Sequence, residues 1–151
     1  MNTTKESPIR TDRKAATVVG VLFIIGTVSG LLMFPFITIL NSPDHLSTIA
    51  THESDMIIAT LLKFIMGVAC AGIGLALYPV LKKYNEGLAI GAAGFRIIEG
   101  VIGIVGALAY VALLALSQEF VRAGALASSF YQTADVLINT SAGWLRDVAL
   151  L

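Results

Sequence analysis

Residues 88–116 read LAIGAAGFRIIEGVIGIVGALAYVALLAL, an apolar stretch in which the only charged side chains are Arg96 and Glu99. A run of about 20 apolar residues is long enough to cross a bilayer as a helix. Each charge costs about 2.5–3.5 kcal/mol at the bilayer centre, so a helix that keeps both must satisfy them internally. The stretch therefore predicts a membrane-spanning helix whose Arg96–Glu99 pair, one helical turn apart, faces the inside of a helix bundle.

The composition of the whole chain supports a membrane protein. Of its 151 residues, 56% are hydrophobic and only 13% are charged, which is outside the usual range of soluble domains. Charge-free runs also cover residues 15–43 and 64–81. The formal net charge is zero, which excludes the broad positive field of a nucleic-acid binder. The single cysteine, Cys70, excludes an internal disulfide framework and lies in an apolar run, where a packing role is expected.

The pattern of apolar runs predicts an all-α fold. We expect a polar cytoplasmic tail at residues 1–14 and one transmembrane domain at residues 15–151, with Ser54 or Asp55 capping its second helix. Pro35 allows a kink near the end of the first helix. The short KKYNEG turn makes the second and third helices antiparallel neighbours. Four antiparallel helices are expected at about residues 15–40, 56–81, 88–116 and 130–151.

The final segment is more polar than the other three. Residues 117–129 are expected to form a loop with at most a short interfacial turn, and residues 130–151 read FYQTADVLINTSAGWLRDVALL. A helix that faces a polar bundle interior need not be apolar all round, which favours a fourth span. The alternative is an amphipathic helix that lies in the membrane interface.

Basic residues set the expected orientation. The N-terminal tail carries four, and Lys82 and Lys83 lie in the second connection, whereas the first connection has none and the third has Arg122 alone. The positive-inside rule then places the N-terminus in the cytoplasm.

Small residues four positions apart predict close helix packing, within one chain or between copies. Four such pairs occur: Gly26 with Gly30, Gly67 with Ala71, Gly87 with Gly91, and Gly103 with Ala107.

Glu99 is the residue that most needs a partner, because its short side chain reaches neither membrane surface. It is either half of a structural ion pair, which we favour, or a carboxylate that titrates or binds a cation. A symmetric hairpin sets Lys63 opposite Gly106, roughly 10 Å from Glu99 along the helix, so Lys63 either reaches Glu99 through water or snorkels outward. On the last segment, one of Arg146 and Asp147 is expected to pair with Glu99 or Arg96 near the cytoplasmic side.

No motif of a known enzyme class is present, and no cofactor is expected. His45 and His52 in the first connection are weak metal-site candidates, because their spacing is not the i, i+4 spacing of histidine ligands on a helix. A solvated loop is the simpler interpretation.

The blocks ALYPVLKKYNEGLAIGAAGFRIIEGVIGIVGAL and LSQEFVRAGA, with FRIIEG as the most specific element, resemble a bacterial multi-pass membrane family catalogued as domain of unknown function four-three-eight-six. The resemblance covers nearly the whole chain from the first helix onward. It implies longer members with about six helices and an Arg-Asp pair like Arg146 and Asp147, so this chain is expected to be a shortened member or a fragment.

These observations leave two functional hypotheses for a protein of the bacterial cytoplasmic membrane. The first is a non-enzymatic accessory or structural membrane protein, surrounded by lipid and associated with a second copy or another membrane protein. The second is a small proton-coupled transporter that uses Glu99 as its titrating carboxylate.

Overall fold

The computed structural model describes residues 8–40, 42, 44–124 and 128–149, and all the elements in these ranges are helices. Three stretches are long and apolar enough to cross a membrane: Asp12–Phe36, Glu53–Leu81 and Glu86–Ala123. The elements are α1 (Pro8–Leu32), α2 (Phe34–Leu40), α3 (His45–Thr51), α4 (Glu53–Leu81), α5 (Glu86–Ala123) and α6 (Ser128–Ala149).

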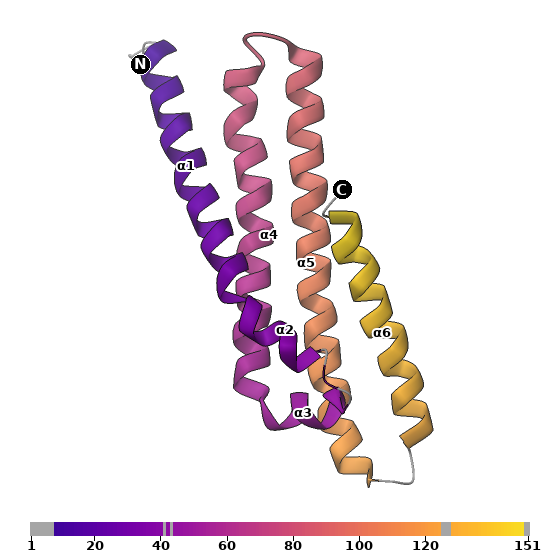
Figure 1. Cartoon of the computed structure of the whole chain (residues 1–151). Helices are drawn as coiled ribbons and strands as arrows, with labels where there is room; N and C mark the ends of the chain where they lie inside the picture. Colours follow the sequence, from indigo (N-terminus) through magenta and orange to yellow (C-terminus); the bar gives the residue numbers. More distant parts are fainter. Residues whose placement is uncertain (1–7, 41, 43, 125–127, 150–151) are drawn as a thin grey trace, which may run out of the picture.

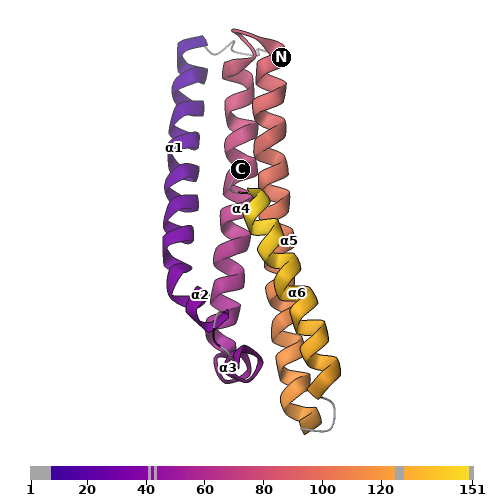
Figure 2. The same cartoon turned by 45° about the vertical axis from the view of Figure 1, so that its right-hand side comes forward.

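The two central helices, α4 and α5, form an antiparallel hairpin, with α1 packed against α4 and α6 packed against α5 (Figures 1 and 2). We call the side of the α4–α5 turn the hairpin end, and the opposite side, where α2 and α3 cross, the α3 end. In both views α6 starts beyond the α3 end and finishes beside the middle of α5. Its described residues therefore leave the half of α5 nearer the hairpin end uncovered.

Glycines bring the backbones of α4 and α5 into direct contact. A Cβ atom added to Gly100 would lie 2.6 Å from the carbonyl oxygen of Gly67 and 2.9 Å from the Cβ of Ala71. A Cβ added to Gly67 would lie 2.8 Å from the carbonyl oxygen of Gly100. Small residues at such a crossing allow close van der Waals packing where no hydrophobic effect drives helices together. This contact fixes the register of the hairpin.

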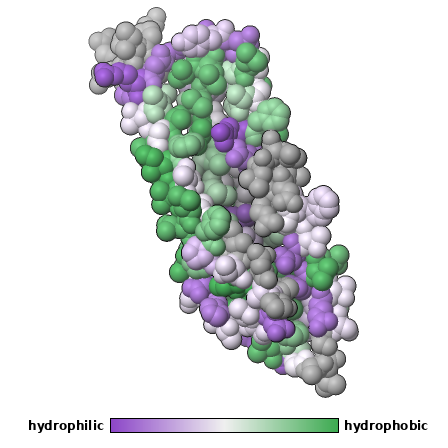
Figure 3. Space-filling model, in the orientation of Figure 1, coloured by the Kyte–Doolittle hydropathy of each residue, from purple (hydrophilic) through white to green (hydrophobic). Residues whose placement is uncertain are grey.

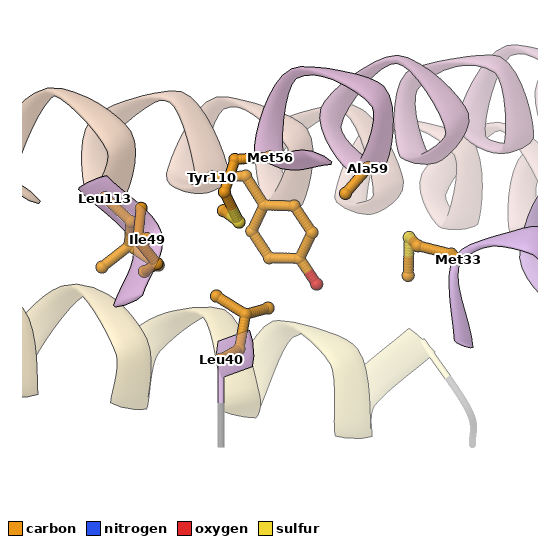
Figure 4. Packing of buried hydrophobic residues seen from close by; sticks show 7 residues of the cluster. All are labelled: Met33, Leu40, Ile49, Met56, Ala59, Tyr110 and Leu113. Atoms are coloured by element: carbon orange, nitrogen blue, oxygen red, sulfur yellow. The ribbon is translucent and has the colours of Figure 1, made fainter. Parts of the chain in front are cut away.

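The apolar core lies at the α3 end, where the short helices close over the hairpin. Figure 4 shows the Tyr110 ring in the middle of this core, between side chains from the other elements. Ile49 of α3 and Leu113 of α5 are fully buried. The core residues are Met33, Leu40, Ile49, Met56, Ala59, Tyr110 and Leu113.

At the hairpin end, polar contacts tie three segments together. Asn85 caps α5, because its side chain accepts a hydrogen bond of 3.0 Å from the backbone N–H of Leu88. An ion pair between Lys83 and Asp12 joins this turn to the first turns of α1. The N-terminal end of α1 and the α4–α5 turn thus lie on the same side of the molecule (Figure 1).

The surface between the two ends is largely apolar. Figure 3 shows green residues over the long helices and purple residues gathered mainly toward the top and bottom of this face. Many large apolar side chains of α1, α4 and α5 are exposed, among them Phe23, Leu61 and Leu108. Such a surface is expected where lipid tails replace water.

The expected first helix, residues 15–40, is two helices in the structure. The chain turns at Met33 between α1 and α2, and α1 begins at Pro8, within the expected polar tail. Pro35 explains the break, because it has no N–H to donate and its ring would collide with the carbonyl one turn earlier. The expected kink is therefore a full break.

The connections also contain more helix than expected. The first connection includes α3, and α4 begins at Glu53 with His52 as its N-cap residue, so neither Ser54 nor Asp55 is the cap. The third helix continues to Ala123 through residues predicted to be a loop. Two local features favour this continuation. Ser117 is fully buried, and Arg122 forms an ion pair of 2.8 Å with Glu119, one turn away.

The fourth predicted segment is confirmed as a helix, α6, but it is not among the three stretches that meet the length and hydropathy requirements of a span. A fourth span therefore stays a prediction.

Three of the four predicted small-residue pairs contribute packing contacts. Gly26 and Gly30 face α4, where added Cβ atoms would meet Ala69 and Met66 at 3.5 Å. Gly67 with Ala71 and Gly103 with Ala107 belong to the α4–α5 contact. The exception is the Gly87–Gly91 pair, since nothing lies within 4 Å of a Cβ added to Gly91.

We predict that Gly100→Ala lowers the thermal stability of the detergent-solubilised protein, because the added methyl group must push α4 and α5 apart. Overpacking of this kind costs about 1–3 kcal/mol. Gly20→Ala on α1 is the matched control, because nothing lies within 4 Å of its added Cβ. Equal melting temperatures for the two variants would contradict the α4–α5 contact.

Candidate functional site in the groove of the hairpin

The charged pair of α5 is an ion pair within one helix. Arg96 Nη1 lies 2.7 Å from Glu99 Oε2, and the two residues are three positions apart. The other carboxylate oxygen, Glu99 Oε1, accepts a hydrogen bond of 3.6 Å from the Cys70 thiol of α4. The base of Arg96 is packed against α4, because a Cβ added to Gly74 would lie 2.8 Å from the Arg96 Cβ. The predicted pairing of Arg96 with Glu99 is thus present.

The structure does not bury this pair as the sequence led us to expect. The side chains of Arg96 and Glu99 remain 44% and 35% exposed. The described part of α6 ends beside α5 short of the hairpin end (Figures 1 and 2) and does not bury the pair. Within the described single chain, the pair lies on an outer face of the hairpin.

Glu99 belongs to a row of residues along one face of α5, which we call the α5 stripe. Residues four and three positions apart share a face of a helix. From Gly106 onward the stripe is buried, whereas Leu88 and Phe95 are 74% and 78% exposed. The stripe comprises Leu88, Ala92, Phe95, Glu99, Gly106, Tyr110, Leu113 and Ser117. One face of one helix is therefore covered at the α3 end and open at the hairpin end.

Lys63 lies opposite Gly106, as the symmetric hairpin predicted, and its side chain is 9% exposed. Its stem crosses the glycine, and its Nζ lies 5.4 Å from the centroid of the Tyr110 ring. Tyr110 is one turn beyond Gly106, on the side away from Glu99. Lys63 therefore points toward the α3 end in a cation–π contact, and it does not join the Arg96–Glu99 pair.

The α6 helix adds a buried acid that the sequence analysis did not single out. Asp135 is 4% exposed, on the side of α6 that packs on α5. Asn139 and Ala142 follow at helical spacing and are half-buried. The signal was present in the sequence, because these positions repeat every three or four residues along the most polar segment.

The backbone of Arg146 and Asp147 belongs to the last turns of α6, whose end lies beside the middle of α5 (Figure 1) and not near the hairpin end. The expected position near the cytoplasmic side stays a prediction. The two side chains lie outside the described part of the structure, so their pairing with Glu99 or Arg96 stays a prediction.

The weak metal-site candidates His45 and His52 lie at the start of α3 and at the N-cap of α4. Among the described residues, no three His, Cys, Asp or Glu side chains gather closely enough to hold a metal ion. The His52 ring is instead engaged locally, with Nδ1 2.9 Å from the carbonyl oxygen of Thr48. The side chain of His45 is outside the described residues.

Chemically, the site is an ion pair with no net charge, and it lies partly exposed on the side of a membrane helix. Arg96 and Glu99 satisfy each other only in part, since a guanidinium has five N–H donors and a carboxylate about four acceptor positions. Contact with lipid tails leaves the remaining positions unsatisfied. The arrangement therefore favours binding of another polar or charged group that approaches within the membrane.

We predict that Arg96→Leu destabilises the protein more than the double change Arg96→Leu with Glu99→Leu, because the single change leaves a carboxylate in the apolar region. The cost of one such charge is about 2.5–3.5 kcal/mol at a helix centre. Unfolding in mixed lipid–detergent micelles measures the effect.

The matched control for this prediction is Arg122→Leu. Arg122 forms an ion pair of the same spacing with Glu119, but both side chains are mostly exposed, at 73% and 56%, near the end of α5. Loss of an exposed pair costs about 0–1 kcal/mol. Equal losses for Arg96→Leu and Arg122→Leu would show that the Arg96–Glu99 pair is not in an apolar environment.

Comparison with known proteins gives a family but no activity. No curated protein and no solved structure matches the chain. The family model described as Domain of unknown function (DUF4386) matches residues 18–150, which includes α2 to α6 and most of α1. The match therefore confirms the resemblance carried by the FRIIEG segment, and the chain belongs to the DUF4386 family.

Proposed function

We propose that this protein is a non-enzymatic accessory protein of the bacterial cytoplasmic membrane, which acts by binding another membrane helix along the open half of the α5 stripe. The charges of Arg96 and Glu99 serve recognition within the membrane in this proposal. They do not carry out a reaction.

One observation carries the proposal: an ion pair on a membrane-spanning helix is 44% and 35% exposed at its two side chains. Ionisable residues in spanning helices almost always face a bundle interior or a water-filled cavity. Because the described helices cover only the other half of the stripe, an additional helix is the natural cover for Glu99. A polar group on that helix would use the hydrogen-bonding positions that Arg96 and Glu99 leave open.

The contacts at the hairpin end support a cytoplasmic N-terminus. The first turns of α1, which carry Arg13 and Lys14, and the Lys82–Lys83 turn lie on the same side of the molecule (Figure 1), so basic residues gather at the hairpin end. The hydrogen bond with Glu86 raises the pKa of Lys82, whose ordinary pKa already keeps it protonated at physiological pH. A clustered positive side is what the positive-inside rule assigns to the cytoplasm.

A proton-coupled transporter is the second candidate, and one observation favours it. Glu99 Oε1 accepts its hydrogen bond from a thiol, which is a weak donor, so the Arg96 contact is the stronger of the two. The buried Lys63–Tyr110 contact lies farther along α4 and α5, toward the α3 end. Polar side chains spaced along a groove are typical of proton pathways in carriers.

Proton flux driven by a pH gradient in proteoliposomes separates the two candidates. The accessory function predicts the same background flux for the wild type and for Glu99→Gln, because no proton moves through the carboxylate. Glu119→Gln is the matched control, since Glu119 is an exposed carboxylate on the same helix. Wild-type flux that disappears in Glu99→Gln but not in Glu119→Gln would refute the accessory function and establish a carrier.

A further inference from the structure

We propose that the helix that covers the open half of the α5 stripe is α5 of a second copy of this chain, so that the protein forms a two-fold symmetric dimer in the membrane. This inference rests on the proposed function and names its partner. The dimer axis runs along the membrane normal, because two copies inserted in the same orientation are related in that way.

Glu99 of the stripe and its ion-pair partner Arg96, which lies beside the stripe, are self-complementary under such an axis. Arg96 and Glu99 are three positions apart, which separates them by about 4.5 Å along the helix. Equivalent residues of two copies lie at the same depth, so Arg96 of one copy comes within about one turn of Glu99 of the other. Two neutral pairs then form a cluster of four alternating charges. Each carboxylate gains a second cationic donor, and the cluster is shielded from lipid.

The shape of the same face is also self-complementary. A pocket of about 510 Å³ lies at the hairpin end and is lined by Leu88, Gly91, Ala92 and Phe95, together with residues of the α4–α5 turn. Nothing lies within 4 Å of a Cβ added to Gly91, and the Phe95 side chain is 78% exposed. Helical side chains lean toward the N-terminus of their helix, so Phe95 covers the level of Gly91 and Ala92. Phe95 of one copy can therefore fill the pocket of the other.

A lipid is a poorer occupant of this face than a second copy. Acyl chains could fill the apolar pocket, but they offer no donors or acceptors to Arg96 and Glu99, which lie well inside the apolar stretch 88–116. A purely apolar helix of another protein likewise offers no side-chain donors or acceptors to Arg96 and Glu99. A second α5 supplies an aromatic side chain for the pocket and both signs of charge at the depth where they are needed.

Site-directed disulfide formation in proteoliposomes tests the dimer. Ala92→Cys and Ile90→Cys are made separately in a Cys70→Ala background, which removes the only native cysteine. Ala92 is on the stripe, whereas Ile90 is 57% exposed at nearly the same depth but about 200° around the helix. We expect Ala92→Cys to cross-link at least ten-fold faster than Ile90→Cys, since a disulfide requires Cα atoms about 4.4–6.8 Å apart.

A charge exchange tests the part played by the ion pairs. Arg96→Glu and Glu99→Arg each give a chain with two like charges, and we expect neither to self-associate. Mixed together, the two chains should associate, as measured by energy transfer between fluorescent labels on their N-terminal tails. If either variant fails to fold, the neutral pair Arg96→Gln with Glu99→Gln replaces it, and at least a ten-fold loss of association relative to the wild type is expected.

Equal cross-linking of Ala92→Cys and Ile90→Cys, or none at any protein-to-lipid ratio, would overturn the dimer. Association that is unchanged by the neutral double variant would overturn the role of the charges. Failure of the accessory function is seen separately, because it appears as Glu99-dependent proton flux whether or not Ala92→Cys cross-links.

Discussion

The close approach of the α4 and α5 backbones at Gly67 and Gly100 is the contact on which the other features of this protein depend. In lipid, two helices gain little from apolar side chains alone, so a stable hairpin needs a crossing where the backbones can touch. That crossing sets a single register. In this register Cys70 lies beside Glu99, and Lys63 lies across Gly106. The contacts of Cys70 and Lys63 with α5 thus occur in the register that these glycines set.

In this register, the polar residues at the two ends of the hairpin have different surroundings. Toward the α3 end, Lys63 and Tyr110 are buried beneath the short helices, and their cation–π contact lies within the apolar core. Toward the hairpin end, Glu99 and Arg96 have each other and a thiol, but their outer sides are open. The difference arises from coverage and not from composition, since both halves combine charged residues with small and aromatic ones. Coverage explains why Lys63 is buried while the side chains of Arg96 and Glu99 stay partly exposed.

The helices that cover the α3 end owe their form to a few local features. Pro35 breaks the first long helix and turns α2 across the hairpin, which brings Leu40 into the core. The α3 helix then supplies Ile49, whose side chain is fully buried. On the other side of α5, α6 brings Asp135 against α5 and ends beside its middle. The open half of the stripe is thus a consequence of where α6 lies, and not of any lack of apolar surface on α5.

The sequence by itself determined the helical membrane class, the α4–α5 hairpin, the ion pair of Arg96 with Glu99 and the position of Lys63 opposite Gly106. These features follow from local rules: the length of apolar runs, the shortness of the KKYNEG turn and the rise per residue of a helix. The break at Met33, the extension of α5 to Ala123 and the helical α3 were decided by backbone geometry and by packing between elements. Only the tertiary structure decided the exposure of Glu99 and the burial of Asp135, because burial depends on which helices lie alongside, and residues far apart in the chain determine that.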